Sequence, residues 1–190
     1  MAGQEYHKQK ALLLAAVCSQ TYALYHSNGL FVMPEGYETV ATFDAESITG
    51  IPEKFGFVLE SERDAIVAFR GTSSTADWIS DAIASQTKFK YVRGAGQSHR
   101  GMTAIYASAR RPVLAALQRI PADKTLYVTG HSLGGALATL CAMDASANSG
   151  FRSPVLYTFA APRVGDPEFA KAYAARVKSS YRVFNRFDVV

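Results

Sequence analysis

Hydrophobic residues recur along the chain with two spacings, one typical of strands and the other typical of helices. Short apolar runs bounded by polar turns predict strands at residues 39–43, 55–60, 65–69, 125–129, 155–159 and 181–185. The polar turn at residues 61–64 separates the second run from the third. These two strands are therefore expected to form a hairpin.

Other segments place apolar residues three or four positions apart, which is the spacing of one face of a helix. Leu14, Cys18, Tyr22 and Tyr25 follow this spacing and predict an amphipathic first helix. The remaining helical segments are residues 102–120, 133–147 and 167–177. Pro112 is expected to kink or restart the first of these three.

The order of these elements indicates the architecture. An early hairpin followed by strands that alternate with helices predicts a mixed, mostly parallel sheet with helices on both faces. The chain has 190 residues, of which 48% are apolar and 19% charged, and this composition excludes disorder. The length suits one domain with a substantial core.

Charge and cysteine usage point to no particular partner. The net charge is +4, and the nearest approach to a basic cluster with interleaved aromatics, residues 88–93, is interpreted as a solvated strand or loop. Nucleic acid is therefore not implied. Cys18 and Cys141 lie on apolar helical stripes, which favours buried free thiols over a disulfide or a metal site.

The longest apolar run, residues 11–18, is too short to span a bilayer, so no transmembrane segment is expected. Glu5 precedes this run and no small-residue cleavage site follows it, so it fits the first helix better than a signal peptide. Without a visible export signal, the compartment stays open between secreted and cytoplasmic.

A G-x-S-x-G pentapeptide, residues 130–134, lies between the predicted strand 125–129 and the predicted helix 133–147. In this context it is typical of a nucleophile elbow, although the same residues can form a structural glycine turn. The turn is so sharp that side chains at Gly130 and Gly134 would collide with neighbouring backbone. It presents the Ser132 hydroxyl at the positive N-terminus of a helix, where anionic intermediates are favoured.

A serine nucleophile also needs backbone donors for the oxyanion. The N–H of Leu133 directly follows the nucleophile and is the first candidate. The second candidate is Thr72, in the loop that follows the predicted strand 65–69, because its N–H and its hydroxyl can both donate. The alternative for this loop is a small polar turn without a catalytic role.

Two aspartates compete for the carboxylate that orients the base. Asp188 follows the last predicted strand, downstream of Ser132, as the chain order nucleophile, acid, base requires. Asp166 is followed by Pro and Glu at the start of a predicted helix, which favours a structural N-cap. We therefore expect Asp188 to be the catalytic acid.

No histidine follows Asp188, where the chain order places the catalytic base. His7, His26 and His99 precede Ser132, and His131 is bonded to it and cannot bring its ring onto the hydroxyl. All four are interpreted as structural or solvated, with His99 the least certain. The sequence ends two residues after Asp188, which suggests a domain that is incomplete at its C-terminal end.

Six blocks make the sequence resemble the class 3 lipases, the fungal-type triacylglycerol lipase family of the α/β-hydrolase fold. The blocks are residues 67–74 (VAFRGTSS), 78–81 (WISD), 99–101 (HRG), 128–136 (VTGHSLGGA), 158–166 (TFAAPRVGD) and 182–189 (RVFNRFDV). They follow the family's order over most of the chain. Only the family's histidine block is absent.

The resemblance implies a single α/β-hydrolase domain over residues 1–190, with Ser132 as nucleophile, Asp188 as acid, and Thr72 and Leu133 as oxyanion donors. It implies further that residues 73–84 form a short helical lid with an apolar face that includes Trp78. In the family, the position of Asp81 supports the oxyanion hydroxyl, so a Thr72–Asp81 hydrogen bond is expected.

The sequence thus predicts a serine lipase or carboxylesterase that hydrolyses acylglycerol esters at a lipid–water interface, with no cofactor and no metal. A histidine from a further C-terminal segment or a companion chain supplies the base.

A phospholipase A1 or a feruloyl-type esterase would use the same residues, and the elbow alone would also suit a serine peptidase. A non-catalytic lipase-like binding module is the alternative from another class; the missing histidine favours it, whereas Ser132, Asp188 and Thr72 disfavour it. A nucleotide-binding loop at residues 94–96 is weaker still, because the third glycine is absent.

Overall fold

Six strands form one central sheet in the part of the chain that the computed structural model describes, residues 4–47, 50–72 and 85–185. In spatial order they are β1 (Glu38–Glu46), β2 (Pro52–Glu60), β3 (Asp64–Phe69), β6 (Thr125–His131), β7 (Val155–Phe159) and β8 (Ser179–Val183). The first three pair antiparallel, whereas β3, β6, β7 and β8 run parallel. The predicted mixed sheet is confirmed, including the hairpin of β2 and β3.

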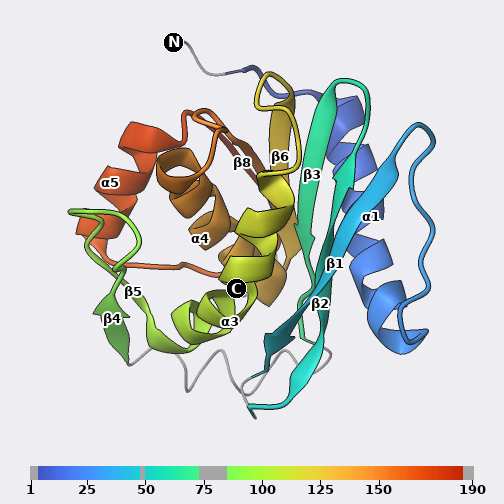
Figure 1. Ribbon diagram of the computed structural model, residues 1–190. Coiled ribbons are helices and arrows are strands. Elements are labelled where there is room, and N and C mark those ends of the chain that lie inside the picture. Colours follow the sequence, from blue (N-terminus) through green and yellow to red (C-terminus); the bar gives the residue numbers. More distant parts are fainter. Residues whose placement is uncertain (1–3, 48–49, 73–84, 186–190) are drawn as a thin grey trace.

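Helices cover both faces of the sheet, as predicted (Figure 1). α1 (Lys8–His26) packs on one face in an apolar cluster that includes Leu14, Leu24, Phe57, Ile66 and Tyr157. α3 (Arg100–Leu117) and α4 (Leu133–Asn148) lie over the larger core on the opposite face, and α5 (Pro167–Arg176) lies beside α4. This packing places the first turn of α4 at the carboxyl ends of β3 and β6.

The last strand lies earlier in the chain than the predicted residues 181–185. β8 pairs in parallel with β7, from Ser179 opposite Val155 to Val183 opposite Phe159. After Phe159 the backbone turns away at Ala160, whose φ is 47°. β8 therefore loses its partner after Val183, and this boundary depends on a neighbouring strand rather than on the local sequence.

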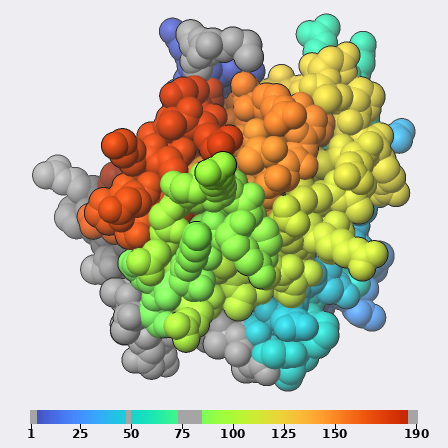
Figure 2. Space-filling view, turned by 60° about the vertical axis from the view of Figure 1, so that its left-hand side comes forward, coloured from blue at the N-terminus to red at the C-terminus, as the bar shows by residue number. Residues whose placement is uncertain are grey.

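A two-stranded ribbon, β4 (Gln86–Lys88) and β5 (Gln97–His99), was not predicted. Its strands are too short and too polar to show an alternating pattern. In Figure 2 the green segment that includes this ribbon lies against the red segment of α5. The basic residues at 88, 90 and 93 are exposed as expected, but Phe89 and Val92 are buried in the core. The interpretation of residues 88–93 as a solvated strand or loop thus holds for the basic side chains, whereas Phe89 and Val92 anchor the turn in the core.

α3 runs through Pro112 without restarting, contrary to one of the two predicted outcomes. Pro112 lacks an N–H and leaves one helix carbonyl without its usual donor. The side chain lies on the exposed side of α3, so water can satisfy that carbonyl. The helix ends at Leu117 rather than at residue 120.

Both cysteines are buried free thiols, as predicted. Burial raises the pKa of the Cys18 thiol to about 12, so this group stays protonated at neutral pH. Among the described residues, we find no helix with the length and apolar character that crossing a bilayer requires.

Candidate active site

The link between β6 and α4 is a single residue, Ser132, in an unusual backbone conformation. Its φ is 54° and its ψ is −125°, a combination that glycine adopts readily and other residues rarely adopt. Three backbone hydrogen bonds hold it: Ser132 N donates to Phe159 O at 2.9 Å, and Ser132 O accepts from Gly135 N at 2.9 Å and from Ala136 N at 3.4 Å. Its side chain makes no capping hydrogen bond to α4, so the hydroxyl has no structural task there.

The glycines around Ser132 are required by contact, as the pentapeptide predicted. A Cβ on Gly130 would lie 2.1 Å from the carbonyl oxygen of Gly134. A Cβ on Gly134 would lie 2.2 Å from the carbonyl oxygen of Phe69, at the end of β3. Because both clashes are with backbone, neither can be relieved by a side-chain rotation. The elbow geometry therefore depends on both glycines.

The loop after β3 lies directly against the elbow. A Cβ on Gly71 would lie 2.7 Å from the carbonyl oxygen of His131 and 3.4 Å from the Cβ of Ser132. Thr72, the next residue, is half-buried. On the other side of Ser132, the N–H of Leu133 is the first of α4 and has no carbonyl within the helix to bond. The structure thus brings together the two segments that carry the expected oxyanion donors.

Arg70 anchors this loop, and the sequence reasoning gave it no role. Its guanidinium donates to Glu53 at 2.6 Å and lies 3.9 Å from the ring centroid of Tyr25 and 4.8 Å from that of Phe55. Only 3% of its side chain is exposed. The sequence shows a charged residue directly after a buried strand, which hints at a special role for Arg70. Its partners come from β2 and α1, so the local sequence does not identify them.

The four histidines take structural or exposed positions, in line with their interpretation. The ring of His131 lies 2.9 Å from the Tyr22 hydroxyl on α1. His99, the least certain, caps α3: its Nδ1 accepts a hydrogen bond from Met102 N at 3.2 Å. Burial lowers the pKa of His99, which keeps the ring neutral and able to accept. His7 precedes α1, and His26 is exposed in its last turn.

The assignment of Asp166 to a structural role is confirmed. Its Oδ1 accepts from Phe169 N at 2.7 Å, which makes it the N-cap of α5, with Pro167 in the first turn. Its Oδ2 accepts from Gln97 N at 3.1 Å and ties α5 to β5. Asp188, the lid at residues 73–84 and the expected Thr72–Asp81 hydrogen bond lie outside the described residues.

Replacing Asp166 by alanine is expected to lower the free energy of unfolding by about 2 kcal/mol, since it removes a helix cap and a second hydrogen bond. Asp166→Asn retains one acceptor oxygen and should lose about half as much. Chemical denaturation measures both effects. Equal losses of stability in the alanine and asparagine variants would contradict the role of Asp166 as a helix cap.

Within residues 4–47, 50–72 and 85–185, no three His, Cys, Asp or Glu side chains gather in a way that could hold a metal ion. Next to Ser132, the described residues include the first backbone N–H of α4, at Leu133, and the ring of His131, which lies 2.9 Å from the Tyr22 hydroxyl. Such an arrangement can stabilise an oxyanion formed on attack by Ser132.

Known proteins are similar in sequence to this chain. The family model described as "Lipase (class 3)" matches residues 66–190. A lipase of Rhizomucor miehei is 36% identical over 138 residues, which is 69% of this chain and 38% of that protein. Phospholipase A1-II 1 of Oryza sativa subsp. indica is 31% identical over 179 residues, which is 82% of this chain and 43% of that protein. The chain therefore spans about two fifths of the length of these relatives.

Solved structures share the fold. The native Rhizomucor miehei lipase propeptide complex superposes with a TM-score of 0.78 at 25% identity, covering 98% of this chain and 64% of that one. Lipase II from Rhizopus niveus gives a TM-score of 0.78 at 25% identity, covering 93% of this chain and 70% of that one. The likeness extends over nearly all of this chain.

Proposed function

Since this chain belongs to the class 3 lipase family and has the α/β-hydrolase fold, we propose that it hydrolyses lipid esters through an acyl-enzyme on Ser132. The observation that carries this proposal is the strained backbone of Ser132 at the start of α4. Strain of this kind costs about 1–3 kcal/mol and is typical of functional sites. A glycine turn with a purely structural role would gain stability from glycine at this position.

In the proposed mechanism, the Ser132 hydroxyl attacks the ester carbonyl while a histidine takes its proton. The N–H groups of Thr72 and Leu133 hold the oxyanion, and the histidine then protonates the departing alcohol. Water hydrolyses the acyl-enzyme by the same steps and releases the fatty acid. Asp188 orients the histidine and stabilises its charged form.

We assign the histidine of this mechanism to none of the four in the sequence, because His99 caps α3, His131 bonds to Tyr22, and His7 and His26 lie exposed at the two ends of α1. We place it in protein outside residues 1–190, in a further segment or a companion chain. The substrate is a lipid ester presented at a lipid–water interface, which the printed names of the relatives support.

A fluorophosphonate tests the proposal, because it phosphonylates only a serine that is activated as a nucleophile. We expect one adduct per molecule on Ser132 in the full-length protein that carries this sequence, located by intact-mass and fragment-mass spectrometry. Ser132→Ala should remove the adduct, and Ser146→Ala, which changes a buried serine of α4, should retain it. A full-length protein that stays unlabelled would favour a non-catalytic binding module instead.

A phospholipase A1 is the second candidate, favoured by the rice phospholipases, whose match covers 82% of this chain against 69% for the Rhizomucor miehei lipase. Initial rates on triacylglycerol and on phosphatidylcholine vesicles separate the two activities. Release of the sn-1 fatty acid from phosphatidylcholine at the higher rate would identify a phospholipase A1. Both outcomes would use the same Ser132.

A further inference from the structure

We propose that Tyr22 of α1 is a positioning residue for the oxyanion site, because its hydroxyl ties the loop that carries Thr72 to the elbow that carries Ser132. This inference rests on the proposed function and adds a residue from outside the motifs. Tyr22 lies on the helix of the opposite sheet face from α4, and the sequence reasoning used it only as an apolar helical position.

The hydroxyl of Tyr22 contacts both segments. It lies 2.9 Å from Nδ1 of His131, the residue before Ser132. It also lies against the backbone of Gly71, the residue before Thr72. The contact with Gly71 is close, since a Cβ there would lie 2.3 Å from the hydroxyl oxygen. One side chain thus holds the two residues that precede the proposed nucleophile and the proposed oxyanion donor.

A tyrosine hydroxyl can both donate one hydrogen bond and accept others, so the bond between Tyr22 and His131 can form with either neutral tautomer of the ring. Burial raises the pKa of Tyr22, which keeps its proton in place at neutral pH.

Gly71 explains why such a tether matters for an oxyanion site. Glycine is the most permissive residue in backbone conformation, and the torsions of Gly71 set the direction of the Thr72 N–H. An oxyanion donor is effective only within about 2.7–3.1 Å of the charged oxygen. Arg70 fixes the loop before Gly71 through Glu53 and Tyr25, so the backbone torsions left without a restraint are those of Gly71 itself. The contact with the Tyr22 hydroxyl restrains these torsions.

Tyr22→Phe in the full-length protein tests the inference, because it keeps the ring and deletes only the hydroxyl. With a short soluble ester such as p-nitrophenyl butyrate, we expect kcat to fall about 10- to 100-fold while KM changes little, as for a weakened oxyanion donor. The inhibition constant of a boronic acid, which forms a tetrahedral adduct with serine, should rise by about the same factor. The ¹⁵N shifts of the His131 ring should also change, because the variant removes the hydrogen bond at Nδ1.

Tyr37→Phe is the matched control. The Tyr37 hydroxyl donates to Asp64 at 3.1 Å, at the opposite end of β3 from Gly71, so this variant also loses one tyrosine hydrogen bond. We expect a similar loss of thermal stability and unchanged kcat. An active wild type with unchanged kcat in Tyr22→Phe, or equal loss of kcat in both variants, overturns the inference alone. A full-length wild type that hydrolyses no ester overturns the proposed function and the inference with it.

Discussion

Replacing Ser132 by glycine is expected to abolish ester hydrolysis and, in the same protein, to raise the free energy of unfolding by about 1 kcal/mol. The backbone of Ser132, with φ 54° and ψ −125°, suits glycine and strains every residue that carries a Cβ. Loss of the nucleophile should lower kcat by about 10⁴- to 10⁶-fold. Activity and stability thus change in opposite directions at one position.

Ser132→Ala is the comparison that separates the two effects. Alanine removes the hydroxyl and keeps the Cβ, so it should lose the same activity and gain little stability. Guanidinium chloride unfolding of the wild type and both variants, with hydrolysis rates at saturating ester, measures both quantities. Residual hydrolysis above about a hundredth of the wild-type rate in either variant would show that Ser132 is not the nucleophile. Equal stability of the glycine and alanine variants would show that the backbone conformation at Ser132 is not strained by a Cβ.

The features that the sequence predicted correctly are those set by residues close together in the chain. The spacing of Gly130, Ser132 and Gly134 indicates the elbow, because the collision that excludes a side chain at Gly130 is with the backbone of Gly134, four residues later. The cap at Asp166 is equally local, since it bonds to Phe169 three residues later. For the same reason, the alternation of strands and helices was sufficient to predict the mixed sheet.

The features that escaped prediction depend on contacts between distant segments. The end of β8 is set by its partner β7, and the anchoring of Arg70 requires Glu53 from β2 and Tyr25 from α1. The role inferred for Tyr22 likewise requires that α1 pack beneath the loop after β3. A hydrophobic pattern shows that Tyr22 faces the core, but it does not show which backbone its hydroxyl reaches.

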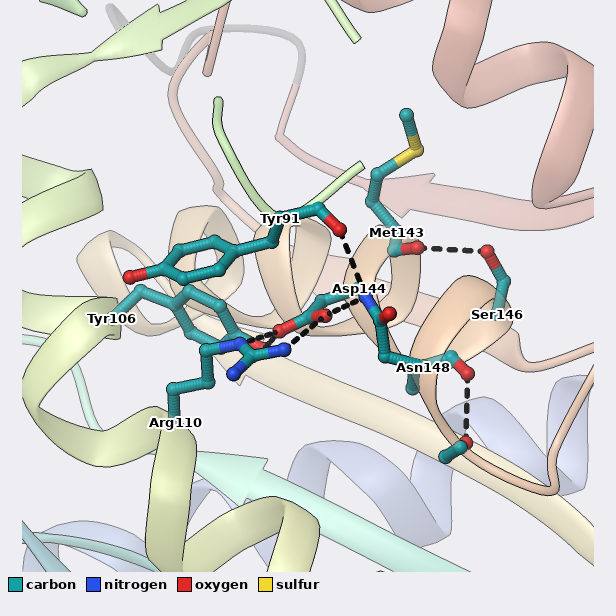
Figure 3. Close-up of polar contacts among 9 residues, drawn as sticks. Tyr91, Tyr106, Arg110, Met143, Asp144, Ser146 and Asn148 are labelled. Atoms are coloured by element: carbon teal, nitrogen blue, oxygen red, sulfur yellow. Dashed lines mark hydrogen bonds and ion pairs between the residues drawn. The ribbon is translucent and has the colours of Figure 1, made fainter. Parts of the chain in front are cut away.

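A second large effect is expected at Asp144, a fully buried carboxylate in α4 (Figure 3). Its Oδ2 accepts from the Tyr106 hydroxyl at 2.6 Å and from Arg110 Nε at 2.5 Å. Its Oδ1 accepts from Arg110 Nη2 at 3.1 Å and from Asn148 Nδ2 at 2.6 Å. The Arg110 guanidinium also lies 4.4 Å from the ring centroid of Tyr91, which joins α3, α4 and the β4–β5 turn.

Asp144→Ala is expected to lower the free energy of unfolding by about 3–5 kcal/mol, because it leaves the buried Tyr106 hydroxyl and the partly buried Arg110 guanidinium without their common acceptor. This is a large share of the roughly 5–15 kcal/mol by which a domain is stable. Urea unfolding measures the loss. Ser146→Ala, which deletes a buried serine hydroxyl bonded only to the Met143 carbonyl of the same helix, should cost no more than about 1 kcal/mol. Equal losses in the two variants would contradict the large contribution to the free energy of unfolding that we assign to Asp144.

A double-mutant cycle with Tyr106 shows whether the loss of stability in Asp144→Ala comes from the hydrogen bonds of the carboxylate or only from the packing of its side chain. Tyr106→Phe alone should cost about 2 kcal/mol, since it removes a hydrogen bond to a buried charge. In the Asp144→Ala background, the same change should be neutral or stabilising, because there the Tyr106 hydroxyl is already buried without its acceptor. Additive losses would mean that the two side chains contribute independently. A coupling of about 2 kcal/mol or more would instead identify the Tyr106–Asp144 contact as one that holds α3 against α4.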